Sequence, residues 1–204
     1  MSSTTHTTPA HTSAGGDTET LVDARAVLDQ LAACGITHVV TVPDFIQMSV
    51  HHLLADNYLP DVEVIRTSTE DEAVVIAAGL YLGGKSPVVI VQNQGLYACV
   101  NNLRAIGLDV GLPIMLMIGQ FGREKENFGR STANSTRRVV RLLEPLLDTL
   151  EIPHLPLEVP ADLGNVARVF ELSREHNWPA ALIVGVPTGW PPNEDNDPTT
   201  AEGA

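Results

Sequence analysis

The sequence contains few cysteines and few basic residues. Its two cysteines, Cys34 and Cys99, lie in apolar surroundings, which argues against a disulfide framework and for reduced structural thiols. The chain of 204 residues has 12 lysines and arginines against 25 aspartates and glutamates, a formal net charge of −13. This acidity argues against nucleic acid and anionic membranes as partners.

Long apolar runs and a signal sequence are also missing. No run approaches the roughly 18 residues of a membrane span, and the N-terminus lacks the basic-then-apolar pattern of a signal peptide. These absences predict a soluble, cytoplasmic protein. With 44% hydrophobic residues, a chain of this length can still bury one good core, so one domain is expected.

The two ends of the chain differ in composition from the middle. Residues 1–18 are rich in Ser, Thr, His, Pro and Gly, and residues 188–204 are acidic and rich in Pro. Such segments have too little apolar surface to fold. We therefore predict two disordered tails around one folded domain over residues 19–187.

Apolar runs alternate with amphipathic stretches between the tails. We expect strands at residues 37–42, 62–66, 87–92, 112–119, near 154 and at 180–186. Helices are expected at residues 20–35, 46–57, 70–82, 96–106, 137–150 and 161–176, with a long polar loop at 120–136. This alternation predicts an α/β fold of three layers, a mainly parallel sheet with helices on both faces.

The segment of residues 67–84 joins a predicted strand to a helix of small residues. The hydroxyl residues at 67–69 can cap the first N–H groups of that helix. Residues 77–79 are Ala, Ala and Gly, which leave room for another backbone to approach. Glu70 lies in the first turn of that helix. Its side chain is expected to face the space beyond the end of the preceding strand.

Three turns each follow a predicted strand and precede a predicted helix: Asp44, Glu70 and Asn93-Gln94-Gly95. In a parallel sheet all three lie at the carboxyl edge, where open α/β sheets bind ligands. Each also has a purely structural interpretation. Asp44 can be a helix N-cap, Glu70 an acid favoured by the helix dipole, and residues 93–95 a simple turn. Together, on one edge, they favour a ligand site.

Three segments carry a family resemblance: Val42-Pro-Asp-Phe45, Glu70-Asp-Glu-Ala73 with the run from Ile76 to Gly84, and Val91-Gln-Asn-Gln-Gly-Leu96. They resemble the pyrimidine-binding domain, or α subunit, of thiamine diphosphate-dependent 2-oxo acid decarboxylases. The sulfopyruvate and phosphonopyruvate decarboxylase group is the most similar. The spacing from Glu70 to Gly79 is the most specific element, and it matches Glu70, rather than Glu72, to the family's catalytic glutamate.

The resemblance implies roles for several residues. Glu70 would hydrogen-bond to the aminopyrimidine of thiamine diphosphate and favour the tautomer that deprotonates the thiazolium. Asp44 matches an acid near the substrate that can relay protons. The turn that borders the cofactor corresponds to Asn93, Gln94, Gly95 and Leu96. Where relatives tend to carry Gly-Leu-Gly-Asn, this chain has Gly95-Leu-Tyr-Ala98, so Tyr97 becomes a candidate for contact with the substrate.

A second family motif is missing. The Gly-Asp-Gly segment that holds Mg²⁺ and the diphosphate does not occur in the foldable part. The resemblance therefore implies no metal site in this chain and a β-type partner subunit that supplies it, without which the chain is inactive. Self-association is expected as well. The small-residue helix surface around residues 73–77 and 96–106 is either the mating face or packs only against its own sheet.

Basic residues gather at the end of the polar loop. Arg123, Lys125 and Arg130 are followed closely by Arg137 and Arg138. Arg123 and Arg130 are candidates to bind a carboxylate, sulfonate or phosphonate of the substrate, unless the cluster is a solvated helix start. His51 and His52 fall within the second predicted helix, near the Asp44 turn. Either one of them approaches the site or, as we expect, both are packed or exposed helix residues.

Three hypotheses for function follow. The favoured one is a pyrimidine-binding subunit of a heteromeric decarboxylase for a small 2-oxo acid of the sulfopyruvate or phosphonopyruvate type. A carboligase would form the same carbanion but pass it to a carbonyl acceptor. The third is a binding or regulatory domain that has lost catalysis, an alternative that the Tyr97-Ala98 departure keeps open.

Overall fold

The computed structural model of the protein describes residues 21–189. The predicted tails at 1–18 and 190–204 lie outside the described residues. Thr188 and Gly189 fall in the segment predicted as C-terminal tail, yet both are buried. The backbone nitrogen of Thr188 donates to Ile46 (3.0 Å), and that of Gly189 donates to Val22 (2.8 Å). The folded part therefore reaches Gly189.

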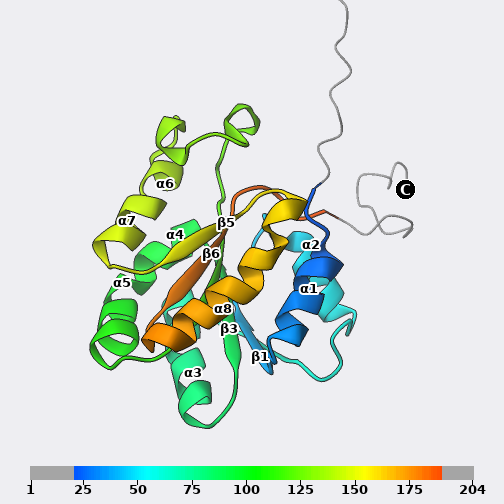
Figure 1. Cartoon of the computed structure of the whole chain (residues 1–204), viewed down its shortest axis with the longest axis vertical. Helices are drawn as coiled ribbons and strands as arrows, with labels where there is room; N and C mark the ends of the chain where they lie inside the picture. Colours follow the sequence, from blue (N-terminus) through cyan, green and yellow to red (C-terminus); the bar gives the residue numbers. More distant parts are fainter. Residues whose placement is uncertain (1–20, 190–204) are drawn as a thin grey trace, which may run out of the picture.

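A six-stranded sheet forms the centre of the molecule (Figure 1), in the order β2-β1-β3-β4-β6-β5. Every pair of neighbouring strands is parallel. The strands are β1 (His38–Thr41), β2 (Glu63–Arg66), β3 (Pro87–Gln92), β4 (Met115–Gly119), β5 (His154–Leu157) and β6 (Ala180–Val184). The predicted α/β fold with a parallel sheet is confirmed.

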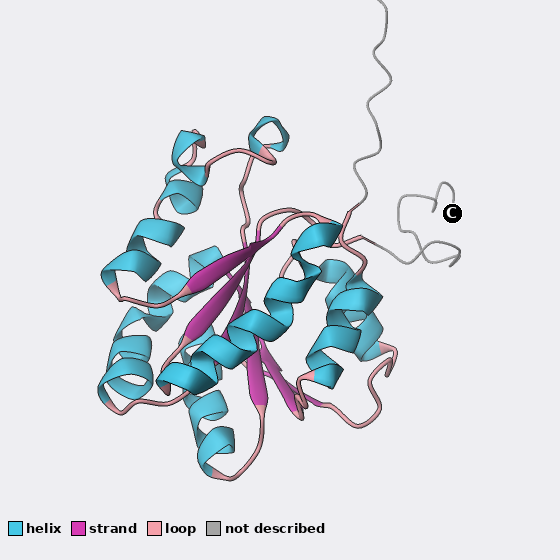
Figure 2. Cartoon of the chain, viewed as in Figure 1, coloured by secondary structure: helices cyan, strands magenta, loops and turns pink. Residues whose placement is uncertain are grey.

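Helices cover both faces of the sheet (Figure 2). Alternate side chains of β3 belong to different cores: Val88 and Ile90 to one, and Val89 and Val91 to the other. Burial on both faces explains why the strands are continuous apolar runs. The first core is closed by α1 (Ala24–Ala33), α2 (Met48–Ala55) and α8 (Asn165–His176), and the second by α3 (Glu70–Leu82), α4 (Asn93–Leu96) and α7 (Leu143–Thr149).

Residues 93–109 depart from the predicted turn and single helix. The chain forms α4 directly after β3, then a 3₁₀ turn (Tyr97–Cys99), α5 (Val100–Asn102) and a π-helical segment (Leu103–Asp109). At Gly107 the wide turns approach Pro179 so closely that a Cβ would lie 2.3 Å from its Cγ. The local helix geometry thus accommodates a tertiary contact, which sequence periodicity does not encode.

The predicted helix at 137–150 is divided in two. Helix α6 (Arg138–Arg141) ends before α7 begins at Leu143. Pro145 has no N–H to donate to the carbonyl of Arg141, and its ring would clash with that carbonyl in a continuous helix. As the third residue of α7, Pro145 stands where an N–H has no partner within the helix.

The predicted hydroxyl caps of α3 are wrong. Thr69 is the N-cap residue, but its side chain accepts no hydrogen bond from the helix. The carboxylate of Glu72 instead accepts from the backbone nitrogen of Ser68 (3.0 Å). This hydrogen bond ties the first turn of α3 to the residue before the N-cap, and it caps none of the N–H groups of the helix itself. Within the described part of the chain, no helix has the length and apolarity that crossing a membrane requires.

Candidate active site

The strand order reverses at β1. From β1 the chain passes to β2 on one side and then crosses back to β3 on the other. In open α/β sheets a crevice forms at such a reversal, outside the carboxyl ends of the strands. Asp44, Glu70 and Asn93 follow β1, β2 and β3 respectively, so the topology brings the three predicted turns to one edge.

Glu70 and Gly95 lie against each other at this edge. A Cβ on Gly95 would be 2.0 Å from Cδ and 2.1 Å from Oε1 of Glu70. The absence of a side chain at 95 is therefore what allows the carboxylate to lie over α4. Glu70 is half-buried and begins α3, at the positive end of the helix dipole. Its carboxylate accepts no hydrogen bond from residues 21–189, so both oxygens remain available to a ligand.

Cys99 supports the same turn. Its buried Sγ donates to the carbonyl oxygen of Gly95 (3.3 Å). Burial, with the negative charges of Glu70 and Asp71 nearby, raises the pKa of the Cys99 thiol to about 12. Cys99 is therefore a neutral thiol at physiological pH, and its role is to hold the turn rather than to act as a nucleophile.

Asp44 lies beneath the edge, with its side chain fully covered. Oδ1 accepts from the backbone nitrogens of Ile46 (2.8 Å) and Gln47 (2.9 Å), and Oδ2 accepts from Nε2 of Gln47 (2.8 Å). Gly119 makes room for it, because a Cβ there would be 2.6 Å from Oδ1. The carboxylate thus organises the turn that leads into α2, but Asp44 is not the helix N-cap of its structural interpretation, because the N-cap residue of α2 is Gln47.

Asn93 and Tyr97 tie two segments to the sheet edge. Nδ2 of Asn93 donates to the carbonyl oxygens of Phe121 and Val139 (both 3.1 Å), and its Oδ1 accepts from the backbone nitrogen of Gln94 (2.9 Å). The Tyr97 hydroxyl also donates to Val139 (2.6 Å), and burial raises the pKa of that phenol. Both side chains therefore have structural partners, whereas Gln94 is exposed. Leu96, the remaining predicted member of this turn, is buried.

The structure does not bring Arg123 and Arg130 together as an anion site. The side chain of Arg123 is 1% exposed. Its Nε and terminal nitrogens donate to side-chain or backbone oxygens of Gln120, Asn127, Arg130 and Glu158. These contacts use its N–H groups and fasten the loop at 120–136, which extends beyond the sheet in Figure 1. Arg130 is exposed and shares a surface cavity with Glu124 and Glu126.

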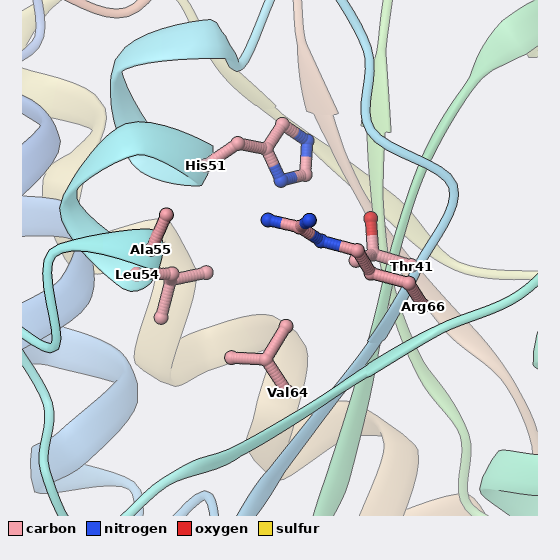
Figure 3. A pocket seen from close by; sticks show the side chains of 6 residues that line it. All are labelled: Thr41, His51, Leu54, Ala55, Val64 and Arg66. Carbon is pink, nitrogen blue, oxygen red and sulfur yellow. The ribbon is translucent and has the colours of Figure 1, made fainter.

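A pocket of about 350 Å³ lies at the ends of β1 and β2, lined by Thr41, His51 and Arg66 on its polar side (Figure 3). Arg66 is not among the predicted site residues, although its place at the carboxyl end of a parallel strand is a usable signal. His51 is buried beside Asp44 rather than merely packed in a helix. Among residues 21–189, no group of three or more His, Cys, Asp or Glu side chains is placed to hold a metal ion.

Comparison with known proteins agrees with this geometry. The α subunit of sulfopyruvate decarboxylase from Methanococcus maripaludis is 26% identical over 161 residues, covering 78% of this chain and 90% of that protein. The same subunit from Methanothermobacter thermautotrophicus is 28% identical over 153 residues, covering 72% and 87%. That from Methanocaldococcus jannaschii is 31% identical over 98 residues, covering 48% and 55%.

A family model also matches more than half of the chain. It describes the N-terminal TPP binding domain of thiamine pyrophosphate enzymes and covers residues 23–137. That range contains Asp44, Glu70 and the turn at 93–96, so the predicted resemblance to a pyrimidine-binding domain is confirmed. The chain therefore belongs to the thiamine pyrophosphate enzymes and carries their N-terminal TPP-binding domain.

Proposed function

We propose that this chain is the α-type, pyrimidine-binding subunit of a thiamine diphosphate-dependent decarboxylase that acts on a small 2-oxo acid with a second anionic group. The substrate would be of the sulfopyruvate or phosphonopyruvate type. The observation that carries the proposal is the free carboxylate of Glu70, which lies over Gly95 at the strand-order reversal. The names of the relatives, sulfopyruvate decarboxylase subunit alpha, support the substrate class.

The residues at this edge fit the pyrimidine half of the cofactor. Glu70 offers two oxygens without a partner among residues 21–189, and these can share a proton with a ring nitrogen. Gly95 presents bare backbone next to that carboxylate, with Asn93, Gln94 and Leu96 in the same turn. When bound, the cofactor supplies the electron sink that makes decarboxylation possible. Glu70 is proposed to hold the proton at the ring nitrogen and to orient the ring.

Asp44 has an indirect part in the proposal. Its carboxylate is covered by its own chain, so it does not contact a substrate bound at the edge. We assign it a positioning role: it fixes Gln47 and the entry to α2 through its hydrogen bonds. Arg123 stays outside the proposal because its N–H groups are engaged within the loop. Tyr97 and the exposed Arg130 remain proposed contacts for the substrate.

Mg²⁺ and the diphosphate are proposed to be held by a separate β-type subunit. The relatives are named as α subunits, which implies a partner chain. The Gly-Asp-Gly segment that binds the metal in this family does not occur in the sequence of this domain. We further propose that two copies of the α-type chain associate in the assembled enzyme.

Release of carbon dioxide from sulfopyruvate and phosphonopyruvate by the assembled enzyme tests the proposal. Replacing Glu70 with Gln should lower turnover about 10²–10⁴-fold without unfolding the chain, because the amide cannot take up the ring proton. Glu72→Gln is the matched control, since this exposed acid lies two residues away and the amide can still accept from Ser68. Unchanged turnover in Glu70→Gln would refute the assignment of the site.

The two rival functions give different results in the same assay. A carboligase would release carbon dioxide and join the remaining fragment to an added aldehyde, which product analysis by mass spectrometry detects. A non-catalytic domain would release no carbon dioxide from any 2-oxo acid in the presence of the partner, cofactor and Mg²⁺.

A further inference from the structure

The pocket at the ends of β1 and β2 has two chemically different walls (Figure 3). Its volume is about 350 Å³, and it lies between α2 and the edge of the sheet. The polar wall consists of Thr41, His51 and Arg66. The apolar wall consists of Leu54, Ala55 and Val64. A cavity of this kind suits a small molecule with a charged head and a short carbon stem.

Nε2 of His51 is a buried polar atom without a hydrogen-bond partner in the described part of the chain. The side chain of His51 is 9% exposed, and Nε2 makes no hydrogen bond within residues 21–189. The nearest acid is Asp44, whose Oδ2 lies 3.6 Å from Nε2, too far for a hydrogen bond. The other ring nitrogen faces the pocket in Figure 3. An imidazole that lies beside a buried carboxylate on one side, with its other nitrogen directed into a cavity, is available to bind a ligand.

Arg66 faces His51 across the same space. Figure 3 shows its guanidinium directed toward the imidazole. Among the described residues, Arg66 has neither an ion pair nor a hydrogen bond to its side chain. Arg66 is exposed, so solvent reaches its guanidinium and an anion can reach it too. A guanidinium without an acid that faces an imidazole leaves room for an anion between them.

Thr41 does not add a donor to this arrangement. Its hydroxyl donates to the carbonyl oxygen of Ile90 (2.6 Å), so only acceptor capacity remains. The donors that reach the pocket therefore come from Arg66 and His51. A guanidinium fork matches two oxygens of a tetrahedral or carboxylate anion, and one ring N–H can reach a third. The imidazole also separates such an anion from the carboxylate of Asp44.

We propose that this pocket is a binding site for a small oxyanion of the sulfonate, sulfate, phosphonate or phosphate type, held by Arg66 and His51. A short carbon chain attached to the anion would lie against Leu54 and Val64. The site differs from the Glu70–Gly95 pair, since it is formed by α2 and the last residues of β1 and β2. The anion has two sources: the far end of the 2-oxo acid, an assignment that rests on the proposed function, or a free inorganic anion.

Titration of the full chain with methanesulfonate, followed by NMR of the labelled histidine rings, tests the site without any enzymatic activity. The ring signals of His51 should shift and saturate, and dimethyl sulfone, which is uncharged, should produce no shift. Arg66→Gln should weaken binding about 10–100-fold, the effect expected for loss of a charged hydrogen bond. Arg66→Lys should retain part of the affinity, because it keeps the charge but not the fork.

Arg168→Gln is the matched control for charge. Arg168 is an exposed arginine of α8 that pairs with Glu171 and Glu175, so the substitution removes the same charge far from the pocket. Its methanesulfonate affinity should equal that of the native chain. No saturable shift at His51, or equal affinities in Arg66→Gln and Arg168→Gln, would overturn the proposal. Circular dichroism of each variant establishes that a lost signal is not lost folding.

Two further measurements, KM values of the assembled enzyme and a sulfate titration, identify the source of the anion. If the site holds the far end of the substrate, Arg66→Gln in the assembled enzyme should raise KM for sulfopyruvate about tenfold or more and leave KM for pyruvate unchanged. If it holds a free anion, sulfate should bind the native chain as tightly as methanesulfonate and both KM values should stay unchanged. Absence of decarboxylation would refute the proposed function, whereas the NMR titration would still decide the anion site.

Discussion

At Gly95 the backbone passes so close to the carboxylate of Glu70 that a methyl group does not fit between them. The backbone of Gly95 has no positive φ, so space rather than conformation requires the glycine. Asn93 and Cys99 reinforce the position through hydrogen bonds on either side. A single missing side chain thus sets where the acid of the candidate site lies.

Gly95→Ala should therefore displace the Glu70 carboxylate. The added methyl, 2.0 Å from Cδ of Glu70, should cost about 1–3 kcal/mol of stability and lower turnover as far as Glu70→Gln does. Thermal unfolding and carbon dioxide release measure the two effects. Gly79→Ala is the control, because no atom lies within 4 Å of its Cβ position, and it should stabilise α3 by roughly 0.5–1 kcal/mol. Native activity in Gly95→Ala would contradict this account of the contact.

Arg123 shows how a basic residue in a polar loop becomes part of the interior. Its side chain is 1% exposed, and it pairs with Glu158, whose side chain is 20% exposed. The substitution Arg123→Leu should reduce the free energy of unfolding by about 3 kcal/mol, because it leaves the acid and several carbonyl oxygens without a donor. Urea unfolding measures this. Arg130→Leu should change stability by less than about 0.5 kcal/mol, since its side chain is exposed. Equal effects would show that the loop is not held by Arg123.

Among the elements, the loop at 120–136 is organised by hydrogen bonds rather than by an apolar core. Two 3₁₀ turns, η3 (Lys125–Asn127) and η4 (Thr132–Asn134), shape it. Glu124 closes it by accepting from Ser135 Oγ (2.7 Å), the backbone nitrogen of Thr136 (3.0 Å) and the Thr136 hydroxyl. Polar closure of this kind depends on the charge of one carboxylate.

The loop should therefore respond to acid. Hydrogen bonds from Thr136 and Ser135 lower the pKa of Glu124 from its ordinary 4.5 to about 2. Because the folded pKa is depressed, the stabilisation is complete above pH 4.5 and is lost as the pH falls toward 2. A ¹³C carboxyl NMR titration should give a Glu124 midpoint near 2, and amide exchange in the loop should accelerate below pH 4.5. In Glu124→Gln that acid-dependent acceleration should vanish. A Glu124 midpoint near 4.5 would exclude this closure.

The irregular helix at residues 97–109 depends on one close contact with the start of β6. Gly107→Ala should lower the free energy of unfolding by about 1–3 kcal/mol, because the new methyl would meet the buried ring of Pro179 at 2.3 Å. Urea unfolding of the chain measures this. Gly164→Ala has open space around its Cβ position and should change stability far less. If both variants behave alike, the π-helical geometry has another cause.

At the scale of the whole molecule, we propose that the carboxyl edge is half of a site. Within residues 21–189, the carboxylate of Glu70 has no partner and lies beside bare backbone at the strand-order reversal. The family's Gly-Asp-Gly segment does not occur in the sequence of this domain. An acid that is left unpartnered beside a helix N-terminus suits a surface that is completed by another chain. The proposed β-type subunit would cover this edge and supply the diphosphate-binding residues.

Calorimetric titration of thiamine diphosphate with Mg²⁺ tests this division of the site. We expect no binding to the purified chain alone and saturable binding after it is mixed with a chain that carries the Gly-Asp-Gly segment, because the diphosphate and metal contribute most of the charge-based affinity. The mixture that contains Glu70→Gln should bind more weakly. Tight binding to this chain alone would show that its own residues hold the diphosphate.

The order of strands and helices was predictable from the sequence because each signal is local. A short continuous apolar run predicts a strand that is buried on both faces of a sheet. The alternation of such strands with helices predicts that the strands pair in parallel. Parallel pairing in turn brings the residues after each strand to one edge, so the sequence alone predicts that Asp44, Glu70 and Asn93 lie at a common edge. The family likeness added their roles and the need for a partner.

Only the tertiary structure decided which of these side chains remain free. Asp44 and Arg123 are enclosed by partners that are close in space, whereas Glu70 is left open and Arg66 faces His51 across a pocket. Such pairings depend on distances of a few ångströms between segments that helix packing brings together, and no local pattern encodes them. The sequence by itself determined the fold and the edge where we propose the site, and packing determined the chemistry that each residue at that edge can perform.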